Sequence, residues 1–290
     1  MKPAAFEYHA PREFDDVLEL LADDSVDARV IAGGQSLVPM MSFRLAAPER
    51  LVDLRRVEAL RELRVEADGT LVVGASVTQA RLLRTVERSH PLLAEGISHI
   101  GHPQIRSRGT VCGSLAHHDP TAELPALALA LDARFSVVSA EGGERELDAD
   151  EFFVSYYEVA LEPGEMLASV TFPAWSGERG WSFRELARRR GDFALVGAVA
   201  TVERSASGTP SDPRLVLFGV GERPVRMHEV EAVLDGAPLD AEGIEATRAL
   251  IADAITPVDD VHASAEYRRE AAVELAVDAL AEAWGRSRDV

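Results

Sequence analysis

The sequence predicts an α/β or α+β fold divided into two or three subdomains. Short apolar strands alternate with helical patterns in the first part of the chain, a run of strands follows, and helical patterns close it. This order of elements predicts the fold class. The segment "WSGERG", Trp175–Gly180, is the best candidate for a boundary before a C-terminal domain.

The first part of the chain contains apolar residues at helical spacing and short apolar runs that indicate buried strands. Helices are expected at 14–22, 78–86, 91–100 and 121–132, and strands at 28–34, 50–55, 70–76 and 134–140. Thr78 and Pro91 mark helix starts. Segment 36–45 is either a helix or turn-rich, because Pro39 fits only near a helix start. The Gly- and Thr-rich segment 107–120 is expected as a loop.

The second part of the chain contains four apolar runs separated by charged turns, and then three helical patterns. The strands are expected at 166–172, 180–187, 194–202 and 213–220, and the helices near 226–234, 240–254 and 266–284.

The charge of the chain excludes several classes of protein. Its 290 residues carry a formal net charge of −19, which disfavours binding to nucleic acid phosphates and to anionic membranes.

The N-terminus lacks the basic-then-apolar pattern of a signal peptide, and no apolar run has membrane-spanning length. A single cysteine, Cys112, excludes a disulfide framework and a Cys-rich zinc or iron–sulfur site. We therefore expect a cytoplasmic protein.

Two glycine-bearing segments attract attention, "VIAGGQSLVPMM" and "RGTVCGSLAHHDPTAELP". Each one is either a tight turn or a cradle of main-chain N–H groups for a phosphate. Two such segments together suggest two cradles that hold one pyrophosphate. Neither matches the dinucleotide fingerprint or the P-loop, and neither contains a lysine. Neutral N–H and O–H donors would therefore bind the phosphates.

Two other chemistries are disfavoured at the second segment. His117 and His118 are adjacent in sequence and their side chains diverge, while His99 and His102 supply no pair at i, i+4 spacing, so a metal site is not expected. A triad of Ser114, His117 and Asp119 would lack the G-x-S-x-G context of a nucleophile. Hydrogen bonding within the loop is the simpler expectation.

Six segments resemble one family in order and spacing. They are "AGGQSLVPMMSFRLAAPERLVDLRR", "PQIRSRGTVCGSLAHHDPTAELPALALAL", "EFF", "LEPGEML", "RRGDFALVGAVATV" and "DDVHASAEYRREAAVELAVDAL". Together they are similar to the FAD-binding medium subunit of the molybdenum hydroxylases, which include the flavoprotein subunits of aerobic carbon monoxide dehydrogenase and xanthine dehydrogenase.

The resemblance implies an α+β fold. A two-part FAD-binding domain, residues 1–175, would consist of a small α/β subdomain (about 1–55) and a larger mixed-sheet subdomain (56–175). A C-terminal domain of antiparallel sheet with helices would span 176–290.

The resemblance also implies which residues contact FAD. Ala32, Gly33, Gly34, Gln35 and Ser36 match the first family loop, and Thr110, Val111, Cys112, Gly113 and Ser114 match the second. Glu123 falls where the family has a carboxylate that bonds ribitol or ribose hydroxyls. Leu161 matches a position that packs on the flavin, and Phe193 an aromatic side chain that covers one isoalloxazine face. No catalytic side chain and no metal ligand are implied.

Two positions depart from the family pattern. Cys112 replaces the first glycine of the second loop. The replacement is harmless if the φ angle of Cys112 is negative. The alignment with the family makes Cys112 face the pyrophosphate. It is otherwise expected to be a small buried hydrophobe. Glu185 stands where the family often has a lysine, so the basic group near the flavin is open.

The function implied is that of an oxidoreductase subunit. Its FAD would take electrons from the iron–sulfur clusters of a small partner subunit, after a large molybdenum cofactor subunit has oxidised the substrate, in a dimer of hetero-trimers. The acceptor, whether quinone, NAD or dioxygen, stays open. Alternatives are a stand-alone oxidase of the vanillyl-alcohol oxidase type and a non-catalytic FAD-binding scaffold.

Overall fold

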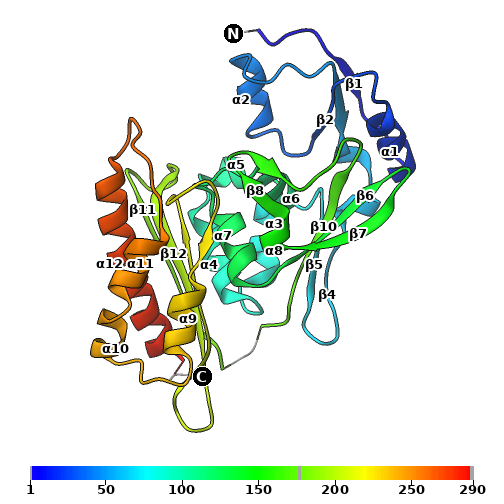
Figure 1. Ribbon diagram of the computed structural model, residues 1–290. Helices are drawn as coiled ribbons and strands as arrows, with labels where there is room; N and C mark the ends of the chain where they lie inside the picture. The colour runs from blue at the N-terminus through cyan, green and yellow to red at the C-terminus, as the bar shows by residue number, and fades with distance from the viewer. Residues whose placement is uncertain (1, 176–177, 288–290) are drawn as a thin grey trace.

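The computed structural model describes residues 2–175 and 178–287, and a small parallel sheet forms the N-terminal part of the protein (Figure 1). Its strand order is β1-β3-β2, with parallel pairing throughout. Parallel strands need crossover connections, and α1 and α2 provide them. The bounds are β1 Glu7–His9, α1 Phe14–Ala22, β2 Ala28–Ile31, α2 Leu37–Ser42 and β3 Arg50–Asp53.

A second sheet has the order β4-β5-β10-β6-β7, and every pairing in it is antiparallel. Its strands are β4 Leu63–Val65, β5 Leu71–Gly74, β6 Arg134–Ser139, β7 Gly143–Asp148 and β10 Met166–Phe172. The pair β8 Phe153–Ser155 and β9 Glu158–Val159 lies beside it. The helices of this part are α3 Gln79–Val86, α4 Pro91–His99, α5 Pro103–Arg106, α6 Val111–His117, α7 Glu123–Ala130 and α8 Ala149–Phe152, with 3₁₀ turns at Leu54–Arg56 and Ala59–Arg61.

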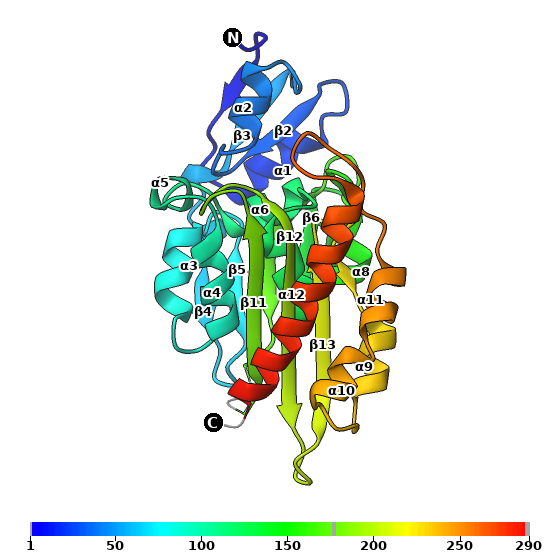
Figure 2. The same cartoon turned by 90° about the vertical axis from the view of Figure 1, so that its left-hand side faces the viewer.

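The third sheet is antiparallel, in the order β11-β12-β13-β14, and the long helix α12 crosses one face of it (Figure 2). The strands are β11 Gly180–Ala187, β12 Ala194–Arg204, β13 Pro210–Phe218 and β14 Val225–Arg226. The helices are α9 His228–Leu234, α10 Ala241–Glu245, α11 Arg248–Ala254 and α12 Ala265–Arg286.

Both faces of the third sheet are buried, which explains its nearly continuous apolar strands. Successive strand side chains point to opposite faces. Val216 and Phe218 of β13 accordingly join the core that contains α4 and α7, whereas Leu215 and Leu217 join the core under α12. The C-terminal sheet is thus packed directly against the preceding helices.

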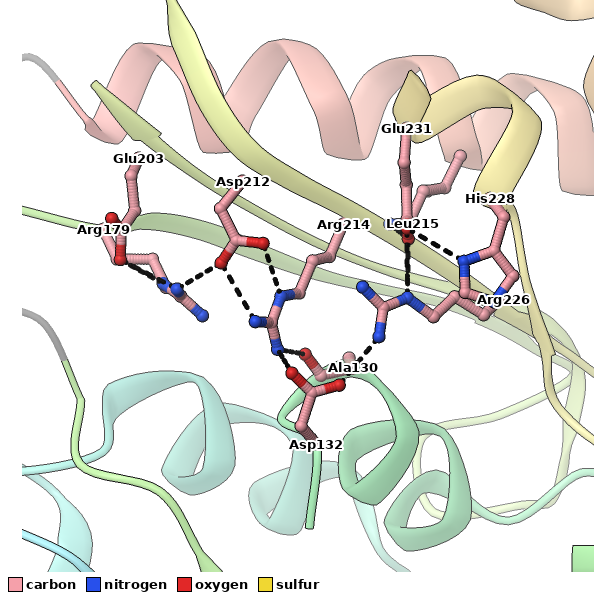
Figure 3. A network of polar contacts seen from close by, with 10 residues as sticks. All are labelled: Ala130, Asp132, Arg179, Glu203, Asp212, Arg214, Leu215, Arg226, His228 and Glu231. Atoms are coloured by element: carbon pink, nitrogen blue, oxygen red, sulfur yellow. Dashed lines mark hydrogen bonds and ion pairs between the residues drawn. The ribbon is translucent and has the colours of Figure 1, made fainter. Parts of the chain in front are cut away.

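A chain of ion pairs reinforces this packing (Figure 3). Asp132, just after α7, accepts bonds from Arg226 of β14, at 2.7 Å, and from Arg214 of β13. Arg214 also pairs with Asp212 at 3.0 Å, and Asp212 with Arg179 at 2.6 Å. The side chains of Arg214 and Arg226 are only 13% and 16% exposed. We call this set the joint network; it also includes Glu203, Glu231 and His228.

The predicted α+β class is confirmed, but several local details differ. The second sheet is antiparallel rather than mixed. Segment 107–120, expected as a loop, contains helix α6. The helix expected at 240–254 is divided into α10 and α11. The boundary segment 175–180 includes residues outside the described part.

Candidate functional site

The two glycine segments lie against each other in the structure. A Cβ added to Gly33 would be 2.4 Å from the carbonyl oxygen of Arg108 and 2.7 Å from the Cα of Gly109. A Cβ at Gly113 would be 3.6 Å from the Cβ of Ala32. Two main-chain segments far apart in sequence therefore approach as closely as glycine permits.

The first segment presents unused main-chain donors. Within the described residues, nothing accepts a hydrogen bond from the N–H groups of Gly33, Gly34, Gln35 or Ser36. Gly34 has a φ of +70°, and Ser36 precedes α2 without a side-chain bond to that helix. Successive N–H groups in a tight turn form an anion-binding concavity. The segment is therefore a cradle without an internal partner for its donors.

The second segment uses most of its donors internally. Within it, Thr110–Ser114 forms the start of α6, where the Thr110 hydroxyl accepts a hydrogen bond from the Gly113 N–H at 3.1 Å. Val111 donates to the Val77 carbonyl and Ser114 to that of Thr110. Among the described residues, the main-chain N–H groups of both Thr110 and Cys112 have no acceptor. The Ser114 side chain adds a hydroxyl at this helix start.

The side chain of Cys112 does not face the cradle, which corrects that expectation, but it is the small buried hydrophobe that the sequence predicted. It is 2% exposed, and its Sγ lies 3.5 Å from the Val73 carbonyl in the core. Burial raises the pKa of the thiol to about 12, which keeps it protonated and unreactive. Its backbone is helical, so the Cβ introduces no left-handed strain.

Glu123 is the first residue of α7 and is 7% exposed. Burial raises the pKa of its carboxyl to about 8, so it holds a proton at neutral pH. The charge of Glu185 contributes to this, whereas His99 opposes it. The sequence marked Glu123 as a cofactor contact and Glu185 as a position near the flavin, but it gave no sign that Glu185 and His99 lie on elements packed beside each other.

Leu161 and Phe193 occupy different surroundings. Leu161 follows β9 and packs partly buried against the main core. Phe193 stands between β11 and β12 and is 69% exposed. It lines a cavity of about 860 Å³ that also includes Tyr157, Arg188 and His262. Asp119, Pro120 and Thr121, near the end of the second glycine segment, also line that cavity, whereas Ala32–Ser36 and Thr110–Ser114 are not among its described lining residues.

Tyr157 in the cavity wall and His118, to which it is hydrogen-bonded, have backbone conformations that the sequence did not reveal. His118 and Tyr157 have positive φ, 45° and 55°, and the Tyr157 N–H donates to the His118 carbonyl. The Tyr157 hydroxyl donates to Asp119 at 3.2 Å, and burial together with that carboxylate raises its pKa to about 12. Non-glycine residues with left-handed backbone conformations are strained, and such residues cluster at functional sites.

The histidines of this region make packing and main-chain contacts. His118 is fully buried, with Nδ1 3.0 Å from the Glu158 carbonyl, and the His117 ring lies 5.2 Å from that of Tyr157. Among the residues described, no group of three or more His, Cys, Asp or Glu side chains is placed to hold a metal ion. In the described part of the chain, the side chains of Ser114 and His117 form no hydrogen bond of the kind that a catalytic triad needs.

Comparison with known proteins identifies the family. Residues 4–175 match the family described as FAD binding domain in molybdopterin dehydrogenase, and residues 181–283 the CO dehydrogenase flavoprotein C-terminal domain. The chain is 39% identical to the 6-hydroxypseudooxynicotine dehydrogenase complex subunit alpha of Paenarthrobacter nicotinovorans, covering 99% of this chain and 97% of the relative.

Solved structures agree. A carbon monoxide dehydrogenase of Hydrogenophaga pseudoflava superposes with a TM-score of 0.94 at 36% identity, covering 99% of both chains. Quinoline 2-oxidoreductase of Pseudomonas putida 86 gives 0.92 at 37% identity, with the same coverage. None of the described helices is long and apolar enough to cross a bilayer. The chain belongs to the family of FAD-binding medium subunits of the molybdenum hydroxylases.

Proposed function

We propose that this chain holds one FAD non-covalently, with the pyrophosphate between Ala32–Ser36 and Thr110–Ser114. The observation that carries the proposal is the row of unused N–H donors at Gly33–Ser36, set against the start of α6. This cradle fits a diphosphate because neutral donors in a fixed concavity stabilise its charge. Once bound, FAD supplies the redox chemistry.

The remaining predicted residues orient the cofactor. We assign to Ser36 and Ser114 the hydroxyl donors of the cradle, and to Glu123 a hydrogen bond with a ribose or ribitol hydroxyl. Phe193, whose ring is exposed on its loop, would cover one face of the flavin ring. Cys112 supplies no covalent link in this arrangement, because its thiol is buried in the core.

We further propose that the chain works in a dimer of hetero-trimers with a large molybdenum cofactor subunit and a small iron–sulfur subunit. One buried cysteine cannot hold a four-cysteine cluster, so electrons must come from another chain. Relatives bear names such as medium chain and medium subunit, which supports this assignment. We also propose the domain division at residues 175/176 and, from the single unpaired cysteine, a cytoplasmic location.

Two measurements test the proposal. The purified chain should contain one FAD per molecule, released as free yellow cofactor when acid precipitates the protein; a colourless chain, or colour that stays in the precipitate, contradicts non-covalent binding. The iron–sulfur subunit, reduced with dithionite and freed of excess reductant, should bleach the flavin of this chain. Bleaching of the isolated chain by an organic substrate would instead favour a stand-alone oxidase.

A further inference from the structure

Three ionisable side chains lie where α4, α7 and β11 meet; Glu123 and Glu185 are buried, whereas the His99 side chain is 33% exposed. Glu123 begins α7, His99 ends α4, and Glu185 belongs to β11. The Glu185 side chain is 4% exposed. The His99 ring packs on the ring of Phe183, also on β11, with centroids 4.9 Å apart. At Gly96 the helices approach so closely that a Cβ would be 2.5 Å from the Leu127 side chain.

Glu185 and His99 form an ion pair. Nδ1 of His99 lies 3.3 Å from Oε2 of Glu185. The contact is not aligned as a hydrogen bond, and that oxygen is buried without another partner among the described residues. The contact with Glu185 raises the pKa of His99 against the opposing effect of burial. A cation in contact with a buried carboxylate offsets part of the cost of burying its charge.

Glu123 is influenced by both members of the pair. Burial has the largest effect on its pKa, the negative charges of Glu185 and Asp119 raise it further, and His99 lowers it. A like charge disfavours a second carboxylate nearby, so the proton stays on Glu123. The three groups belong to different elements, which are brought together by the packing of α4 on α7 and of β11 on α4.

The other charged groups around this cluster are compensated, neutral or exposed. Glu95 of α4 lies 3.6 Å from His99, but its side chain is 46% exposed. Arg106 of α5 is occupied by the carbonyls of Ser98, Ile100 and Gly101. His117 of α6 has a pKa lowered by burial. Arg214 and Arg226 approach α7 at its other end, about 10 Å away by the rise of a helix.

We propose that Glu185 and His99 are positioning residues that set the protonation of Glu123 and thereby make FAD binding depend on pH. The inference rests on the proposed function, in which Glu123 contacts the cofactor. A protonated carboxyl can donate a hydrogen bond to a ribose or ribitol oxygen. Its anion would place an uncompensated buried charge near the diphosphate. FAD affinity should therefore fall, by up to about tenfold per pH unit, above the pH at which free Glu123 loses its proton.

The experiment compares the full chain with three variants, Glu185→Gln, His99→Gln and Glu95→Gln. Infrared difference spectra, recorded without FAD and assigned by loss of the band in Glu123→Gln, follow the protonated carboxyl of Glu123 from pH 5 to 10. The midpoint should move to lower pH in Glu185→Gln and to higher pH in His99→Gln, each by about one unit. Glu95→Gln, a matched change at an exposed site on the same helix, should leave it in place. Circular dichroism confirms folding of each variant.

Fluorescence titration with FAD at each pH gives the second measurement. The pH at which affinity begins to fall should move in the same two directions. If the infrared midpoints move but no protein binds FAD at any pH, the proposed function fails and the electrostatic coupling stands. The inference is overturned if the infrared midpoint of Glu123 is the same in all variants. It is also overturned if the affinity of the chain for FAD is the same at every pH.

Discussion

Replacing Gly33 by Ala is the sharpest test of the contact between the two glycine segments. The added Cβ would lie 2.4 Å from the Arg108 carbonyl oxygen and 2.7 Å from the Gly109 Cα. An ordinary contact is about 3.4 Å, so the segments must separate by about 1 Å. Both neighbours are main-chain atoms and cannot rotate away, which places the cost near the upper end of overpacking, about 2–3 kcal/mol.

If the two segments separate only when FAD is to be bound, the FAD affinity falls by about 30- to 150-fold. Isothermal titration calorimetry of the FAD-depleted chain measures this affinity. Gly109→Ala should have a smaller effect, because its Cβ would meet chiefly the flexible end of Gln79 at 2.9 Å. Gly285→Ala adds the same methyl group where nothing lies within 4 Å and should leave affinity unchanged. Equal affinity in all three variants would refute the close approach and favour two ordinary turns.

Three further outcomes are expected. Gly113→Val would place its Cβ 2.5 Å from the Thr110 hydroxyl oxygen and break the helix-cap bond, so FAD content should be lost from a chain that still gives a folded circular dichroism spectrum; normal FAD content would contradict the two-segment cradle. Asp132→Ala leaves the two arginines of the joint network without their shared carboxylate (Figure 3), and should lower the free energy of unfolding in urea by about 1–3 kcal/mol. Cys112, with its pKa raised by burial, should react with a thiol reagent only after the chain is unfolded in guanidinium.

The Asp132→Ala test has a control variant, and the Cys112 test has an outcome that would contradict it. For Asp132→Ala it is Asp278→Ala, which removes a carboxylate whose side chain is 63% exposed and 3.8 Å from its arginine; a comparable loss in both variants would show that the joint network has no special role. For Cys112, labelling of the folded chain at the rate of a free thiol would contradict its burial.

Local patterns were enough to predict much of the fold. Helix 14–22 was expected at the bounds it has, because its apolar residues recur at helical spacing within one short segment. Thr78 caps α3 as predicted, its hydroxyl accepting from the Arg81 N–H. By contrast, β7 has an almost entirely polar sequence and was missed, since an edge strand exposed to water needs no apolar pattern.

Parts of the candidate site could likewise be predicted from the sequence, and parts could not. The order and spacing of its segments, compared with a known family, were sufficient to name FAD and to select Ala32–Ser36, Thr110–Ser114 and Glu123; their contacts with the cofactor stay predictions. The sequence assigned no structure to "TVCGSLAH" beyond a loop, because its glycine and hydroxyl residues favour turns, yet it forms α6. That helix turns the Cys112 side chain into the core, which no local pattern could show.

The sequence by itself therefore determined the family, the cofactor and the α+β class, because these depend on residue types at fixed spacings along the chain. Only the tertiary structure placed Glu185 beside His99, joined Asp132 to two arginines of the third sheet, and left the donors of Gly33–Ser36 without acceptors among the described residues. Each of these depends on how segments distant in sequence pack. Burial, which has the largest effect on the pKa of Glu123, and the charges of Glu185 and His99 arise from that packing, whereas only Asp119 acts on it from nearby in the sequence.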